Sequence, residues 1–507
     1  SSRIMCGFVV TTDVKNTELM LSKQAFRGPD AQSFHKDSRI GMGHALLDIN
    51  GEMQIQPYKT KNNNYIVFNG EMYDTSIAND TEYLANGLET YGFEFLVHNN
   101  WHGSIVWYKP KENEVHFIRD HFGAKPLWIY KKGKDFTLTT SLRSILSAKP
   151  DNSHKQLYMM NGLLQGDECH LENVSKASPG QYSIINLKTG SWVKKNLWNG
   201  FKVENRPLDI KEFRHKLVQN IRKLAKTKQK VGLFLSGGLD STTVLSVVKD
   251  MGLDLTVYIC GYDKSKPRHH EHNAFRHESE MAVKTCQKWG VPYKVVVLRQ
   301  DLMYHYDRDW LEKTGYPWTD RNRRAPRYLL AKHASQDGCK VILTGDSADE
   351  LFSGYLHHHK FWIENYIEDK LAWMRKKYSW YPKIRHGGDR WNDMLLADLL
   401  VTSETNITAT DQTCGMFGME SRPVFLGQNF VSYCYRFDGF SKMKQHPSWD
   451  TGTYKFLLRE GMADYLPQHT RAKKKKIGWS SPWDNNHPEI QKMSRMLDWQ
   501  FTQSLFE

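Results

Sequence analysis

The sequence contains no long hydrophobic run. None of its 507 residues lie in a stretch that approaches the roughly 18 consecutive apolar residues of a membrane helix. The apolar run at Cys6–Thr11 is also too short for the core of a secretory signal. A hydrophobic content of 39% still allows a sizeable buried core. We therefore expect a soluble globular protein with no membrane partner.

Paired cysteines are also missing. The seven cysteines are scattered, odd in number and without any C-x-x-C pair. Exported proteins usually pair their cysteines, whereas the cytosol keeps thiols reduced. The pattern predicts free thiols and a cytoplasmic location.

Acidic residues are too few to balance the basic ones, and the net charge is +14. Such a charge suits a polyanionic partner, either a nucleotide or a nucleic acid. No recognised DNA- or RNA-binding module is visible, so a nucleic acid is the less favoured partner.

The chain is longer than one core usually organises, and we expect two domains. Short strands separated by turns dominate the first part, with one helix predicted over Asp80–Tyr91. These strands are predicted over Gly7–Thr11, Tyr65–Phe68, Ser104–Tyr108, Val115–Ile118, Phe136–Thr140 and Tyr182–Ile185. Val193–Leu208 has no periodicity and is the candidate linker. The first domain is placed at residues 5–200.

Beyond the linker, helices and strands alternate. A helix is predicted over Ile210–Lys226, and helix-like sequence dominates from Glu364 onward. Strands are predicted over Val231–Leu235, Leu255–Cys260, Tyr293–Leu298 and Lys340–Leu343. This alternation is typical of a parallel sheet with right-handed crossovers. Residues 207–507 are therefore predicted to form a doubly wound α/β domain.

The clearest chemical motif is the loop Ser236–Ser241, with the sequence Ser-Gly-Gly-Leu-Asp-Ser, after an apolar strand. Its glycines, Gly237 and Gly238, let backbone N–H groups approach a phosphate, and the following helix start adds positive charge. The serines can donate hydrogen bonds, and Asp240 can hold Mg²⁺. An ordinary tight turn is the alternative, which the coincidence of strand, serines and carboxylate disfavours. No Gly-Lys-Ser/Thr follows, which excludes a Walker A loop.

This loop resembles the pyrophosphate loop of the ATP pyrophosphatases (PP-loop enzymes), which adenylate a substrate and release pyrophosphate. Leu343–Tyr355 resembles the segment S-G-E-G-x-D-E-x-F-x-G-Y of asparagine synthetases and β-lactam synthetases. A carboxylate-rich loop after an apolar strand can place Asp349 on a second Mg²⁺ position opposite Asp240; a helix cap is the alternative for Asp349. The resemblance implies ATP and Mg²⁺ as cofactors. It also assigns three more residues to the nucleotide site: Leu235, Cys260 and Gly345.

Cys6 is the candidate nucleophile of the first domain. A thiol beside its own α-amino group has a built-in general base, so glutaminase activity should be very low while Ser1–Met5 stays attached. A buried structural cysteine is the alternative. Three segments resemble landmarks of the N-terminal-nucleophile (Ntn) glutaminase domain of class II amidotransferases: Arg27–Asp30, Asn69–Tyr73 and Arg119–Leu127. With the motifs of the second half, the resemblance to glutamine-dependent asparagine synthetase covers nearly the whole chain.

The resemblance implies an α-β-β-α sandwich of the Ntn-hydrolase type for the first domain. Cys6 would attack the glutamine amide, with the Asn69 side chain and the Gly70 N–H as an oxyanion hole that lowers the barrier by about 3 kcal/mol. Glu71 and Asp80 would bind glutamine, Asp80 through the α-ammonium group. Ammonia would then pass through the interior to the second site.

Three positions depart from the family pattern. Leu46 stands where the family has an arginine that grips the glutamine α-carboxylate, and losing that contact weakens binding unless a nearby Arg or Lys substitutes. Otherwise the domain would prefer another amide, or free ammonia would be the nitrogen source. The catalytic carboxylate Asp346 replaces a glutamate and is one methylene shorter, and Gly427 replaces an aspartate.

Two clusters of like residues remain. Lys473–Lys476 aligns with the family segment R-x-K-x-x, and Lys475 is assigned as the catalytic cation that stabilises pyrophosphate and the acyl-adenylate transition state; a solvated basic run is the alternative for its neighbours. The histidine clusters at 269–277 and 357–359 lack the spacing of a known metal site, so a metal there is disfavoured. A loop over the active site is expected for the first cluster.

The leading hypothesis is a glutamine-hydrolysing amide synthetase that converts a carboxylate, by default aspartate, into an amide with release of AMP and pyrophosphate. One alternative keeps the chemistry on another acceptor, a specialised metabolite or a nucleobase carboxylate. The other is a non-catalytic paralogue, against which the retained site residues argue. A homo-oligomer is compatible with the sequence.

Overall fold

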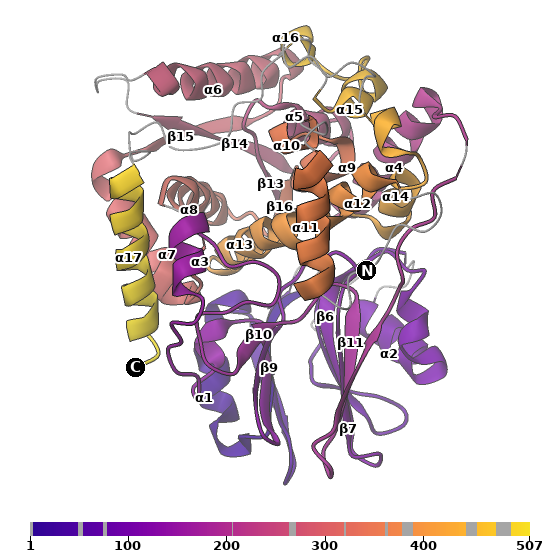
Figure 1. Cartoon of the computed structure of the whole chain (residues 1–507), viewed down its shortest axis with the longest axis vertical. Helices are drawn as coiled ribbons and strands as arrows, with labels where there is room; N and C mark the ends of the chain where they lie inside the picture. Colours follow the sequence, from indigo (N-terminus) through magenta and orange to yellow (C-terminus); the bar gives the residue numbers. More distant parts are fainter. Residues whose placement is uncertain are drawn as a thin grey trace.

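The computed structural model describes residues 4–48, 54–74, 79–204, 206–262, 270–318, 321–359, 364–377, 389–442, 454–472 and 488–507. Two bodies lie one above the other in Figure 1, a strand-rich one below and a helix-rich one above. The predicted two-domain α/β architecture is thereby confirmed. Within the described ranges, no helix combines the length and the apolarity needed to cross a membrane.

The first domain contains two antiparallel layers of strands. One layer comprises β10 (Val174–Lys176), β8 (Trp128–Lys132), β9 (Asp135–Thr139), β1 (Ile4–Thr11), β3 (Gly41–Asp48) and β2 (Ala31–Lys36). The other comprises β4 (Tyr58–Lys59), β5 (Tyr65–Met72), β6 (Trp101–Lys109), β7 (Glu114–Arg119), β11 (Gln181–Asn186) and β12 (Trp192–Asn196). The pairing of β1 with β5 joins the layers, at Ile4 and Gly70. Their facing sides share one core, in which Phe8 and Val10 pack with Val67.

Helices cover the outer faces of both layers. Successive residues of a strand point to opposite faces, so Val9 of β1 turns away from the shared core. It packs with Met20 and Leu21 of α1 (Thr17–Ser22). On the other side, Leu84 of α2 (Asp80–Tyr91) packs against β5 and β6. This order of layers confirms the predicted α-β-β-α sandwich.

The candidate linker is wrong at its start. Trp192–Asn196 forms β12, where Val193 lies opposite Ile184 of β11. β12 is an edge strand, and an edge strand keeps its lysines in water. Its pattern therefore lacks the alternation that reveals a half-buried strand.

Five parallel strands form the sheet of the second domain. Their order is β15 (Tyr293–Leu298), β14 (Leu255–Tyr262), β13 (Val231–Phe234), β16 (Val341–Thr344) and β17 (Glu420–Pro423). The doubly wound prediction is confirmed, and the order reverses between β13 and β16. In such sheets ligands bind at the carboxyl ends of the strands at this reversal.

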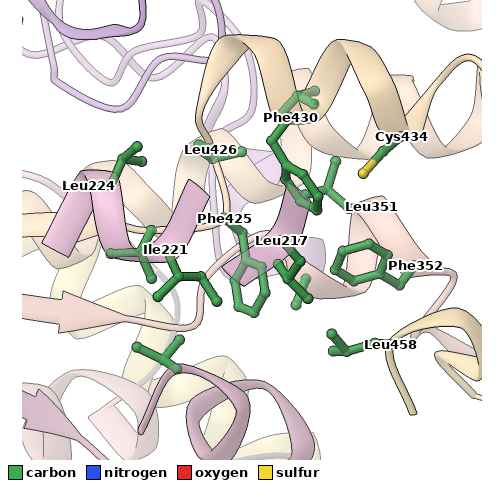
Figure 2. Packing of buried hydrophobic residues seen from close by; sticks show 14 of the residues in the cluster. Leu217, Ile221, Leu224, Leu351, Phe352, Phe425, Leu426, Phe430, Cys434 and Leu458 are labelled. Atoms are coloured by element: carbon green, nitrogen blue, oxygen red, sulfur yellow. The ribbon is translucent and has the colours of Figure 1, made fainter. Parts of the chain in front are cut away.

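Helices surround this sheet and link the domains: α3 (Lys155–Asn161), α4 (Ile210–Ala225), α5 (Leu239–Val248), α6 (His270–Trp289), α7 (Met303–Thr314), α8 (Arg321–Gln336), α9 (Ala348–Phe352), α10 (Leu356–His359), α11 (Glu364–Lys377), α12 (Arg390–Ala397), α13 (Glu404–Gly415), α14 (Gln428–Cys434), α15 (Phe456–Gly461), α16 (Gln468–Arg471) and α17 (Pro488–Ser504). Figure 2 shows the core in which Leu217 of α4 lies among Phe352 of α9 and Leu458 of α15. This core fixes α9 and α15, whose ends carry residues of the site described below.

Fully buried ion pairs join the two domains. Asp411 pairs with Arg27 at 2.7 Å and Lys125 at 3.2 Å, Glu404 with Arg119 at 2.6 Å and Lys176 at 2.8 Å, and Arg422 with Glu71 and Glu420 at 2.6 Å each. Removing one partner of such a pair leaves an uncompensated buried charge. These contacts therefore hold the domains in one relative orientation.

Three buried histidines of the first domain predict how stability depends on pH. Burial lowers the pKa of His44, His121 and His170 to about 3, from an ordinary value of 6.5. Below pH 6.5 the unfolded chain binds more protons than the folded one, so stability falls by up to about 1.4 kcal/mol per pH unit per histidine. The urea midpoint should be lower at pH 5 than at pH 7, and His170→Gln should reduce this difference. Equal midpoints in the unchanged protein would contradict the assignment.

Candidate functional site

A cavity of about 480 Å³ lies at the carboxyl ends of β13 and β16. The loops that follow these two strands form its floor, and α8, α13 and the segment at Tyr454–Arg459 complete its walls. It therefore occupies the point where the strand order reverses, as expected for a ligand site in a doubly wound sheet.

The glycine-rich loop after β13 forms part of the cavity floor. The Gly238 N–H donates to Ser236 Oγ at 3.1 Å, and the Ser236 N–H donates to Ser241 Oγ at 3.2 Å. Gly237 has φ +80°, and a Cβ there would collide with the backbone carbonyl of Glu278. With α5 beginning at Leu239, backbone N–H groups and a helix N-terminus gather at the cavity. The arrangement fits a phosphate chain.

The carboxylate-rich segment after β16, which carries Asp346 and Asp349, lies near the glycine loop. Lys455 lies between Asp349 of this segment and Asp240 of the glycine loop. Lys455 Nζ contacts Asp240 Oδ2 and lies 2.8 Å from Asp349 Oδ1. Although burial opposes its charge, these carboxylates raise the pKa of Lys455, which stays protonated. Because Lys455 is 215 residues from Asp240 in sequence, the sequence interpretation did not find it. Lys455 therefore lies between Asp240 and Asp349, the two carboxylates that the sequence assigns to Mg²⁺.

Backbone strain concentrates at the same place. Six described residues other than glycine have positive φ, and three of them are asparagines, which tolerate this conformation. The other three are Ser347, Ser353 and Lys455. Ser347 and Lys455 line the cavity, and Ser353 precedes Gly354, which also lines it. Strained residues of this kind persist where the surrounding structure enforces them, often at functional sites.

Asp346, in the loop after β16, lines the cavity together with Arg323 and Arg327 of α8. Burial raises the pKa of Asp346, against the opposing effect of the Arg327 charge and a hydrogen bond from Thr410. Burial lowers the pKa of Arg327 to about 10, and the neighbouring Arg323 charge acts in the same direction. Two guanidinium groups and one carboxylate thus lie near one another in the cavity lining.

Cys6 lies in the interior of the first domain, on β1. Its N–H donates to Asn69 Oδ1 at 3.1 Å, and the amide Nδ2 of Asn69 has no hydrogen-bond partner among the described residues. Burial raises the pKa of the Cys6 thiol well above its usual value. Leu46, 2% exposed, packs against Cys6, so an apolar side chain occupies the position of the family's arginine. Gly70, at φ +154°, leaves no room for a side chain beneath His102.

The remaining residues that the sequence singles out lie in three places: the domain interface, the cavity and the hydrophobic core. The Glu71 carboxylate is held by Arg422 at 2.6 Å in the domain interface, and Asp80 Oδ2 accepts the Met72 N–H at 3.1 Å. Leu235 and Gly345 line the cavity, whereas Cys260 lies in a hydrophobic core and does not. A Cβ at Gly427 would collide with the end of the Asn220 side chain, so an aspartate at this position would require Asn220 to move.

The lysine run with Lys475 and the histidine cluster at 269–277 lie outside the residues whose side chains are described. His357 Nε2 and His358 Nε2 lie 2.5 Å and 2.8 Å from Asp398 Oδ2. Their three ligand atoms are close enough for a metal ion. However, His358 Nδ1 accepts the Tyr355 N–H at 3.3 Å, which places the imidazole proton on Nε2. Nε2 therefore acts as a hydrogen-bond donor to Asp398, and a metal is not the favoured interpretation.

Comparisons with known proteins cover both domains. The family model "Asparagine synthase" matches residues 212–506, and "Glutamine amidotransferase domain" matches residues 5–198. The chain is 25% identical over 415 residues to "Putative asparagine synthetase [glutamine-hydrolyzing] 2" of Methanocaldococcus jannaschii, covering 70% of this chain and 75% of the relative. It is 23% identical over 570 aligned positions to "Asparagine synthetase [glutamine-hydrolyzing] 3" of Bacillus subtilis, covering 96% and 88%.

Proposed function

The chain belongs to the asparagine synthase family, and we propose that it activates a carboxylate with ATP at the cavity and converts it into an amide. The observation that carries the proposal is Lys455, held between Asp240 and Asp349 at the carboxyl ends of β13 and β16. A buried cation between two carboxylates, in the same cavity as a phosphate-binding loop, suits a reaction in which pyrophosphate leaves, because the cation can neutralise the charge of the leaving group.

The loop Ser236–Ser241 would bind the phosphates of ATP through its N–H and hydroxyl groups. Asp240 and Asp349 would hold Mg²⁺, since carboxylate oxygens are the ligands that this ion prefers and both face one point of the cavity. The ion supplies positive charge to the phosphate oxygens when bound. Lys455 and Arg459, which both line the cavity, would then neutralise the charge that develops on departing pyrophosphate.

The chemical sequence has two steps. A carboxylate oxygen of the acceptor attacks the α-phosphorus, the bond to the β-phosphate breaks, and pyrophosphate leaves. Ammonia then attacks the acyl carbon, one of its protons passes to a base, and AMP leaves with the former carboxylate oxygen. Asp346 lines the cavity, and the burial that raises its pKa suits it to accept this proton. Aspartate is the default acceptor.

The proposal is tested by pyrophosphate release with ATP, Mg²⁺, aspartate and ammonium as the nitrogen source. Aspartate-stimulated release together with asparagine formation supports it. If neither aspartate nor any other acid stimulates release or ATP–pyrophosphate exchange, the non-catalytic alternative replaces it. Ammonium is used because the synthetase site is then tested independently of Cys6.

Glutamine would supply the nitrogen through Cys6, with Asn69 Nδ2 and the Gly70 N–H as oxyanion donors. In the chain that carries Ser1–Met5, β1 continues through Ile4, which pairs with Gly70. A chain that begins at Cys6 has a free α-amine and loses this pairing, so its glutaminase rate should exceed that of the longer chain by about 10²-fold or more. The rate with ammonium should be equal for the two chains.

Glutamate release measures this difference. Equal rates would show that the free amine is not the general base. A rate that is low in both chains, with normal use of ammonium, would instead indicate that Leu46 prevents glutamine binding. The comparison therefore distinguishes the two nitrogen sources.

A further inference from the structure

A serine next to Asp346 has a backbone conformation that favours glycine. Ser347 has φ +76° and ψ −2°, in the left-handed region where a side chain costs free energy. In the segment S-G-E-G-x-D-E-x-F-x-G-Y, which Leu343–Tyr355 resembles, the second glycine stands at this position. Glycine would adopt the same conformation without strain. This chain therefore carries a hydroxyl group at a position where the backbone alone would favour glycine.

The hydroxyl group of Ser347 pairs with that of Ser403. Their Oγ atoms are 2.8 Å apart, and both residues are buried and line the cavity. Each hydroxyl has one hydrogen, and a bond between two hydroxyls uses only one of the two hydrogens. The part of the chain that the structure describes offers neither side chain a further hydrogen-bond partner. One hydroxyl hydrogen of the pair is therefore available to a molecule in the cavity.

The wall that carries Ser403 also reaches Asp346. A π-helical turn, Asp398–Ser403, leads into α13, and turns of this kind are frequent at functional sites. Ser403 and Thr410 are about two helical turns apart, and both line the cavity. Thr410 forms a hydrogen bond with Asp346. The same wall thus connects the serine pair with the carboxylate that is proposed to accept the proton from ammonia.

We propose that Ser347 and Ser403 determine acceptor specificity, and that the available hydroxyl hydrogen of the pair binds an oxygen atom of the acceptor. The inference rests on the proposed function and deepens it. Ser347 follows Asp346 in the chain, so an acceptor whose acyl carbon lies beside Asp346 is brought close to the pair. The oxygen belongs to a second carboxylate or to a hydroxyl group, since both accept hydrogen bonds. An acid without this oxygen leaves the hydroxyl hydrogen unpaired and binds more weakly.

Two pairs of acids test the proposal by equilibrium binding, with Mg²⁺ and an ATP analogue that cannot be cleaved between the α- and β-phosphates. 3-Aminopropanoate is aspartate without its α-carboxylate, and succinate is malate without its hydroxyl group. In at least one pair, we expect the acid with the additional oxygen to bind about 10-fold or more tightly than its analogue. The pair that shows this preference identifies the oxygen as carboxylate or hydroxyl. Absence of a preference in both pairs, although the ATP analogue binds, overturns the proposal.

Two substitutions separate the hydroxyl group from the backbone strain. Ser347→Gly removes both, whereas Ser347→Ala removes the hydroxyl and keeps a side chain in the left-handed conformation. Both variants should lose most of the preference between the paired acids, while their affinity for the ATP analogue is unchanged. Ser347→Gly should also melt at a higher temperature than Ser347→Ala, because glycine relieves the strain.

Ser353→Gly is the matched control. Ser353 also has positive φ, +60°, in the same segment, but it does not line the cavity. Its variant should keep the preference. A preference that both Ser347 variants retain, or that only Ser347→Ala loses, overturns the role of the hydroxyl. Weaker binding of the ATP analogue by the Ser347 variants would place this residue at the nucleotide and overturn it as well. Failure of the unchanged protein to bind the analogue would instead contradict the proposed function.

Discussion

Replacing Lys455 by methionine is expected to lower acceptor-dependent pyrophosphate release by about 10²- to 10³-fold. Methionine keeps an unbranched chain of similar size, so the change removes mainly the charge. Lys455 is 5% exposed and is the described cation in direct contact with both Asp240 and Asp349. Without it, negative charge on the departing pyrophosphate meets two carboxylates and no neighbouring ammonium. Initial rates at saturating ATP and acceptor measure the effect.

A second measurement separates a catalytic role from damage to the fold. In the absence of nucleotide, Lys455 and Mg²⁺ compete for the same two carboxylates. Lys455→Met should therefore bind Mg²⁺ more tightly than the unchanged protein, and Mg²⁺ should raise its melting temperature more. Lys211→Met, an exposed lysine at the start of α4, is the matched control and should behave as the unchanged protein. Normal turnover by Lys455→Met would remove Lys455 from the mechanism.

Lys455 also illustrates a functional residue that the sequence alone does not reveal. The glycine loop and the carboxylate-rich segment after β16 are local patterns, so the sequence alone points to the carboxylates of Asp240 and Asp349. Lys455 stands alone in sequence, whereas Lys473–Lys476 is a conspicuous run that aligns with a family segment. Its role arises from a contact across 215 residues, which no local pattern contains.

Local sequence patterns likewise predict some elements of the fold and miss others. Periodicity placed α2 at Asp80–Tyr91 and β15 at Tyr293–Leu298, the bounds that the structure shows. β17 was missed because its four residues include Glu420 and Arg422, both fully buried. Their charges suggest a surface segment, and their burial is stabilised by the pair that they form with each other and by Glu71 of the first domain. Hydrophobic patterning therefore predicts elements that pack through apolar faces and overlooks those that pack through ion pairs.

Arg422→Met tests this interface and should lower the free energy of unfolding by about 3–5 kcal/mol. Arg422 lies 2.6 Å from Glu71 of the first domain and 2.6 Å from Glu420 on its own strand, and all three side chains are fully buried. The variant removes the guanidinium that bridges these two buried carboxylates. Urea unfolding measures the loss. Arg206→Met is the matched control, since Arg206 is partly exposed and lies 3.4 Å from Glu212; it should cost about 1 kcal/mol or less.

The effect of pH identifies the cause of this loss. Burial opposes the charge of Glu420, but Arg422 holds the pKa of this glutamate below its ordinary value. The ion pair therefore stabilises the unchanged protein fully at pH values above the pKa of the unfolded chain, and this stabilisation is lost as the pH falls. In Arg422→Met, burial without the cation should raise the glutamate pKa, and protonation should then stabilise the folded state as pH falls. The difference in the free energy of unfolding between the unchanged protein and Arg422→Met should therefore be smaller at pH 5 than at pH 7. Adding Glu71→Gln and Glu420→Gln to Arg422→Met should recover much of the loss at pH 7, because neutral amides replace the unpaired charges. A loss that is independent of pH and unaffected by the two amides would assign Arg422 a packing role instead of an electrostatic one.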